Sequence, residues 1–96
     1  MEAISQLSAF YLKVVDDPRI GPMHNSLYGA LFSLWEKQDY AEPLSVFSYE
    51  AMPLCKFSST ATYHKTIKEL HDYGYIRYIP SYNHFLGSLV YFPSHL

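Results

Sequence analysis

The sequence predicts a small α+β domain that is mainly helical and carries a small antiparallel sheet near its carboxyl end. Apolar residues recur at helical spacing in separate stretches of the chain. The final segment instead contains two runs rich in β-branched and aromatic residues, which is typical of strands. The 96 residues are 49% hydrophobic and contain no long linker, which favours one core and a single domain over residues 1–96.

The first helix is expected over residues 3–15, where apolar side chains recur at helical spacing and stop before Asp17-Pro18. A loop with two prolines and a glycine follows. The second helix is expected over residues 22–38. Pro22 suits its first turn, because the backbone N–H that proline lacks would have no intrahelical acceptor there.

The second helix is apolar over much of its circumference, which predicts either central burial or packing on a second chain. We expect residues 3–38 to supply both core and a homodimer surface, the surface being formed by Tyr11, Tyr28, Phe32 and Trp35. The alternative is that these side chains complete a self-contained core.

Residues 44–47, LSVF, are long enough for a short strand after the break at Glu42-Pro43. Ser48 is then expected to cap a brief helix over residues 49–55. Pro53 falls inside that helix and should keep it short or distorted, because proline removes a backbone donor and clashes with the preceding turn.

The longest polar-faced helix is expected over residues 60–73, capped by Ser58 or Ser59 and ended by Gly74 in the left-handed conformation. A helical wheel directs three apolar side chains toward the core: Tyr63, Ile67 and Leu70. The opposite face is expected to be exposed and carries Ala61, His64, Lys65, Lys68 and Asp72.

The runs at residues 75–80 and 88–92 predict a hairpin with a long tip, which the strand at residues 44–47 would join as a third strand. This order of elements is that of a winged helix-turn-helix. Residues 44–74 would hold the strand and the helix-turn-helix, and residues 75–92 the wing.

Charge is unevenly distributed along the chain, whose formal net charge is −2. Residues 1–55 carry a balance of −4, residues 56–77 a balance of +2, and residues 78–96 no formal charge. The basic excess therefore coincides with the expected helix-turn-helix and permits phosphate contact there.

The run SSTATYHKTIKELHDYGYIRY, residues 58–78, resembles the recognition helix and first wing strand of bacterial winged-helix DNA-binding domains. Residues 24–35 and 80–92 are similar to those of small bacterial winged-helix regulators associated with mobile elements. The resemblance implies a cytoplasmic, sequence-specific binder of duplex DNA that regulates transcription. Such domains often carry Arg or Lys where Thr60 stands, so weak or partner-dependent DNA binding is an expected consequence.

The amino-terminal end of the recognition helix would enter the major groove, where free backbone N–H groups and the helix dipole favour an anion. The expected DNA contacts from this region are Lys56, Ser58, Ser59, Thr60, Thr62, His64, Lys65 and Lys68. Those from the wing are Arg77, Tyr82, Asn83 and His84. The alternatives are that the hydroxyls only cap the helix, that the lysines belong to a solvated face, and that Asn83 and Gly87 only permit turn geometry.

Other chemistry is not indicated. His64 and His71 lie seven residues apart, which is wider than a helical metal pair requires, and no catalytic motif or cofactor loop is present. The single Cys55 and the absence of a signal-like start or a long apolar run favour a non-enzymatic cytoplasmic protein without metal, cofactor or membrane contact. Two alternative functions are a protein–protein interaction module and a replication or excision accessory factor of a mobile element.

Overall fold

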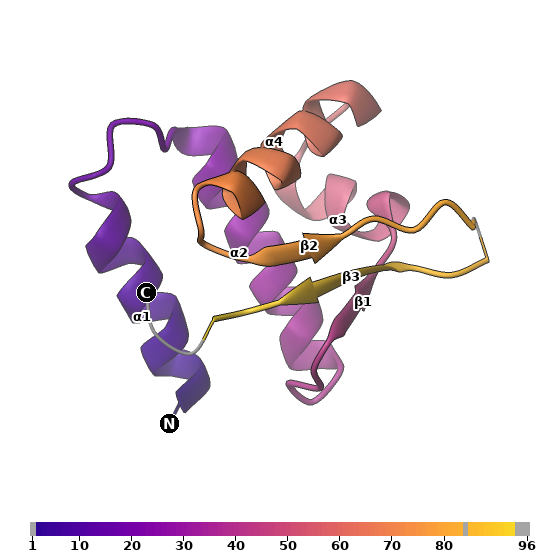
Figure 1. Cartoon of the computed structure of the whole chain (residues 1–96), viewed down its shortest axis with the longest axis horizontal. Helices are drawn as coiled ribbons and strands as arrows, with labels where there is room; N and C mark the ends of the chain where they lie inside the picture. Colours follow the sequence, from indigo (N-terminus) through magenta and orange to yellow (C-terminus); the bar gives the residue numbers. More distant parts are fainter. Residues whose placement is uncertain (1, 84, 94–96) are drawn as a thin grey trace.

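The computed structural model describes residues 2–83 and 85–93, and its helices account for about half of the chain. The elements follow the predicted order (Figure 1) and are α1 (Glu2–Val14), α2 (Pro22–Lys37), β1 (Leu44–Val46), α3 (Ser48–Cys55), α4 (Thr60–Asp72), β2 (Arg77–Ile79) and β3 (Ser88–Tyr91). The predicted α+β class is therefore confirmed. The two strands of the hairpin are shorter than expected.

The three strands form one antiparallel sheet with β3 in the centre, in the order β1-β3-β2. Leu44 of β1 lies opposite Val90, and Arg77 of β2 lies opposite Tyr91. The prediction that the short strand joins the hairpin is thus confirmed. Leu44, Val46 and Val90 are buried, so one face of the sheet packs on the helices while the other stays open.

Both edge strands have a backbone group bound by a side chain. The Gln38 amide donates to the Ser45 carbonyl oxygen at 2.8 Å and accepts from the Ser45 N–H at 3.3 Å. At the other edge, the Tyr78 N–H donates to Nδ1 of His71 at 3.0 Å. These bonds occupy outward-facing backbone groups, which disfavours pairing with a strand of another chain.

Helix α2 lies at the centre of the domain, with α3 and α4 on one side and α1 on another (Figure 1). Phe10 of α1 is fully buried and stacks on Tyr28 of α2, with ring centroids 3.6 Å apart. It also meets the edge of the Tyr75 ring at 5.4 Å. This aromatic cluster attaches α1 to the remainder of the fold.

The expected dimer surface requires correction, because two of its four residues are core residues of a single chain. Tyr28 is fully buried beneath α1, and Trp35 is 7% exposed and stacks on Phe92 with centroids 4.4 Å apart. Phe32 is partly buried beside Trp35, whereas Tyr11 is 42% exposed. The broad apolar face of α2 is therefore covered by α1 and by the segment after β3, as the self-contained alternative predicted.

Two details of α3 differ from expectation. Ser48 is the first helical residue and does not cap the helix. Phe47 occupies the cap position instead, and its N–H donates to the Glu50 carboxylate at 3.2 Å. The helix contains Pro53 and is short, as predicted, because it ends at Cys55. Lys56 follows it in a left-handed conformation with φ of 62°.

A polar network ties the loop between α1 and α2 to the turn after α4. The Tyr75 hydroxyl donates to the Asp17 carboxylate at 2.5 Å, and Arg19 donates to both oxygens of that carboxylate at 2.9 and 2.8 Å. Hydrogen bonds from Arg19 and Tyr75 hold the pKa of Asp17 well below its usual range. Burial and the bond to Asp17 raise the pKa of Tyr75 to about 12.

Candidate nucleic-acid interface

Helix α4 is amphipathic in the way that its sequence predicts. Tyr63, Thr66, Ile67 and Leu70 are buried, and the Thr66 hydroxyl donates to the Thr62 carbonyl oxygen at 2.8 Å. The other face is exposed and consists of Thr60, Ala61, His64, Lys65, Lys68, His71 and Asp72. Packing against the rest of the fold therefore buries the apolar face and leaves a polar surface along the full length of the helix.

Ser59 caps the amino-terminal end of α4, because its hydroxyl oxygen accepts from the Thr62 N–H at 3.2 Å. One of the two predicted serine caps is thus confirmed. Lys56, Ser58 and Thr60 are exposed around this end, and Thr62 is partly buried. The first turn retains N–H groups without intrahelical acceptors, which makes it locally favourable to negative charge.

The exposed lysines of α4 have no ion pair among the residues that the structure describes. Within residues 2–83 and 85–93, neither Lys65 nor Lys68 forms a salt bridge. Glu69 is positioned one turn after Lys65, yet its carboxylate contacts His24 of α2 at 2.9 Å. Because the nearest acid on the helix is directed toward α2, the positive charge of Lys65 stays available to solvent.

His71 has a structural role. Its Nδ1 accepts the Tyr78 N–H, as described for the sheet edge, although its ring is on the exposed side of α4. Among the described residues, no three His, Cys, Asp or Glu side chains come together as a metal site would require.

The tip of the wing is the segment between β2 and β3, and its described part is held by local hydrogen bonds. The Asn83 side-chain oxygen accepts from the Phe85 N–H at 3.0 Å, and the Asn83 carbonyl oxygen accepts from the Leu86 N–H at 2.9 Å. Asn83 therefore organises the turn, as one alternative predicted, and the residue is exposed. Tyr82 is 95% exposed.

Arg77 is exposed on β2, with its guanidinium 5.4 Å from the centroid of the Tyr91 ring. The predicted contact at His84 lies outside the described residues.

Gly87 has a role that turn geometry alone does not explain. A Cβ there would lie 2.5 Å from the Ser45 hydroxyl oxygen and 3.1 Å from backbone atoms of Val46, so glycine allows the wing to approach β1 closely.

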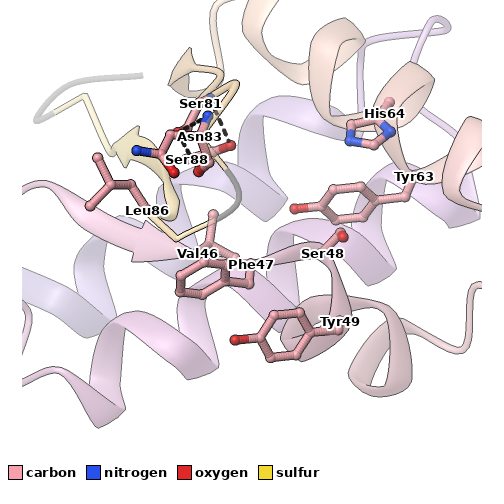
Figure 2. Close-up of a pocket in the computed structure, with 10 residues that line it drawn as sticks. All are labelled: Val46, Phe47, Ser48, Tyr49, Tyr63, His64, Ser81, Asn83, Leu86 and Ser88. Carbon is pink, nitrogen blue, oxygen red and sulfur yellow. Dashed lines mark hydrogen bonds between the residues drawn. The ribbon is translucent and has the colours of Figure 1, made fainter.

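A groove of about 250 Å³ separates the wing from α3 and α4. Figure 2 shows its lining, which comes from β1, the start of α3, the first half of α4, the wing and the start of β3. These residues are Val46, Phe47, Ser48, Tyr49, Tyr63, His64, Ser81, Asn83, Leu86 and Ser88. His64 and Asn83 thus belong to one concave surface, and the amino-terminal end of α4 and the wing extend toward the same side of the molecule (Figure 1).

The sequence did not indicate this groove, because its residues come from separate elements and form no contiguous motif. Tyr63 was expected only as a core residue, and Ser48 only as a cap. The one available signal is chemical: tyrosine occupies a core position of α4 where phenylalanine would supply the same apolar ring.

Comparisons with protein-family models, with curated proteins and with solved structures found no match to this chain. Within the described part of the chain, no helix has the length and apolar character needed to cross a membrane. The observations that bear on function are therefore the geometry of α4, of the wing and of the groove.

Proposed function

We propose that this chain is a winged-helix domain that binds duplex DNA through α4 and the wing, and that it regulates transcription. The order of elements from α2 to β3, and a sheet in which β3 lies between β1 and β2, support this assignment. In such an arrangement the amino-terminal end of α4 enters the major groove, and α3 crosses the DNA backbone.

The observation that carries the proposal is the uncovered polar face of α4. Lys65 and Lys68 are exposed and free of ion pairs among the described residues, which suits them to phosphate contacts. Thr60 and His64 can form hydrogen bonds with base edges, and the small Ala61 can contact a thymine methyl group. Lys56 and Ser58 precede the helix and extend the same basic region.

A single chain of this kind should bind weakly. With about three or four phosphate contacts, the logarithm of affinity falls by roughly 0.9 per contact for each unit of log salt. We propose that a second copy doubles these contacts and that two half-sites lie about one helical turn apart. The outer side of α1 is the remaining candidate surface, since Tyr11, Leu12 and Val15 are exposed there at 42%, 76% and 79%.

The test is fluorescence anisotropy with labelled random duplex DNA across a salt series. The Lys65→Ala/Lys68→Ala variant should bind more weakly, and its salt slope should be smaller by roughly 1.8, because two phosphate contacts are removed. The matched control is Lys13→Ala/Lys37→Ala, which removes the same charge from exposed positions of α1 and α2. Its slope should stay close to that of the unmodified chain.

Two outcomes would overturn the proposal. One is the absence of duplex binding at low salt. The other is an equal loss in both double variants, because that result would indicate attraction by overall charge without a defined interface on α4.

One observation favours a second candidate, a protein-interaction module. The described residues of the wing tip carry no charge, and Tyr82 and Leu86 are 95% and 62% exposed. Since both sheet edges already have side-chain partners, a protein partner would contact these side chains and would not add a strand. A replication or excision accessory factor would use the same α4 face on DNA together with such a wing contact.

A further inference from the structure

The groove beside α4 contains a tyrosine hydroxyl that the fold itself does not use. The Tyr63 side chain is 2% exposed, and its hydroxyl has no hydrogen-bond partner among the described residues. Figure 2 shows this hydroxyl directed away from α4 into the groove, on the side of Ser48 and the wing. The hydroxyl is open to the groove and therefore remains available to a group bound there.

The other deeply buried tyrosines show how the fold normally treats such groups. The Tyr28 hydroxyl accepts from the Gln6 amide at 3.4 Å, and the Tyr75 hydroxyl donates to Asp17 at 2.5 Å. Tyr63 alone among these three has no such bond within the described residues. Burial raises the pKa of Tyr63, so the phenol stays protonated at neutral pH and can both donate and accept a hydrogen bond.

The walls of the groove define the chemical class of a ligand. Phe47 and Tyr49 present stacked rings with centroids 5.1 Å apart, and the Tyr63 ring meets the His64 ring edge-on at 5.2 Å. Hydroxyl and amide groups of Ser48, Asn83 and Ser88 lie among these rings. No Asp, Glu, Lys or Arg is part of the described lining. A neutral, planar group with hydrogen-bonding edges matches this combination.

The volume of the groove further limits the class of ligand that it can hold. A volume of about 250 Å³ falls below the range of about 300–1,000 Å³ that is usual for drug-sized ligands. The groove therefore suits one small ring system with its substituents. His64 belongs both to its lining and to the exposed face of α4, so the groove adjoins the proposed DNA-contacting surface.

We propose that this groove binds a single nucleobase, stacked against its aromatic walls and hydrogen-bonded to the Tyr63 hydroxyl. The base belongs either to a nucleic acid strand in which it is unstacked or to a free nucleoside. The choice of a nucleobase over another planar ring rests on the proposed function, because His64 is shared between the groove and the DNA-facing side of α4.

The test is a ¹H–¹⁵N correlation titration of the full chain with each of the four free deoxynucleosides and with a short single-stranded oligothymidylate. Binding should shift the amide signals of Ser48, Tyr63, His64 and Asn83. Tyr63→Phe removes one oxygen and keeps the ring, so it should weaken binding about fivefold, as expected for one neutral hydrogen bond. Tyr40→Phe is the matched control, because it removes a hydroxyl that bonds to Glu36 outside the groove and should leave the affinity unchanged.

Each outcome has a defined meaning. Shifts with free nucleosides identify a nucleoside site, and shifts only with the oligothymidylate identify a strand-borne base; either result supports the proposal if Tyr63→Phe weakens it. Absence of shifts at the groove with every probe, or an affinity unaffected by Tyr63→Phe, overturns it. The Lys65→Ala/Lys68→Ala variant should bind free nucleosides normally, so failure of this site and failure of duplex binding can be told apart.

Discussion

Polar side chains near the two ends of α4 differ in whether they bond to other residues of the chain. In its last turn Glu69 contacts His24, and beyond its carboxyl-terminal end Tyr75 bonds to Asp17, which bonds to Arg19. Toward its amino-terminal end, Lys65 and the Tyr63 hydroxyl have no bonded partner among the described residues. The first region holds the fold together, whereas the second leaves its chemistry available to a ligand. Bonding within the chain therefore distinguishes the Asp17 network from Lys65 and the Tyr63 hydroxyl.

Tyr75→Phe should give the largest effect of the changes that probe this comparison. Tyr75 is 2% exposed, and the substitution keeps the ring while removing a hydrogen bond to a carboxylate. Bonds to charged groups contribute about 1.5–3 kcal/mol, so the free energy of unfolding should fall by that amount. Urea denaturation measures it as a lower midpoint at an unchanged m-value. A change close to zero would show that the Asp17 network does not stabilise the fold.

The carboxyl-terminal network also predicts a dependence of stability on pH. The folded-state pKa of Asp17 lies below the unfolded value of about 3.9, so its contribution is present above that value and is lost as pH falls through the folded pKa. The stability difference between the unmodified chain and Asp17→Asn should thus be constant near neutral pH and shrink as the solution becomes strongly acidic. Urea denaturation at a series of acidic pH values measures this difference.

An Asp17→Asn difference that stays constant down to strongly acidic pH would contradict the assignment. It would mean that the charge on Asp17 has no specific partner in the folded state. Tyr75 gives an independent control at the alkaline side. Its pKa is raised to about 12, so its contribution is lost between about pH 10 and pH 12, and Tyr75→Phe should remove that part of the alkaline transition.

The sequence predicted local structure well because the signals were local. Apolar spacing located α2 and α4, Gly74 at φ of 88° ended α4 as expected, and the wheel identified the exposed side of α4. The same periodicity could not tell which surface covers the apolar face of α2. Tyr28 and Trp35 were therefore assigned to a dimer, although Phe10 and Phe92 of the same chain cover them.

Features formed by residues far apart in the sequence could not be predicted from local patterns. Asp17 and Tyr75 are 58 positions apart, and the loop around Asp17 contains only turn signals in the sequence. The groove likewise needs the close approach of Gly87 to Ser45, which depends on how the wing folds across β1. Single-chain patterns carry no information about such juxtapositions, so the network and the groove became visible only in three dimensions.

Tyr63→Phe should have the smallest effect on stability and is the sharpest probe of the comparison. It makes the same chemical change as Tyr75→Phe in a side chain that is equally buried at 2% exposure. Because no bond within the described residues is lost, the free energy of unfolding should change by less than about 0.5 kcal/mol or increase slightly. Parallel urea denaturation of both variants measures the contrast. A loss comparable to that of Tyr75→Phe would show that the Tyr63 hydroxyl stabilises the fold, and the groove would then lack the free donor that a ligand requires.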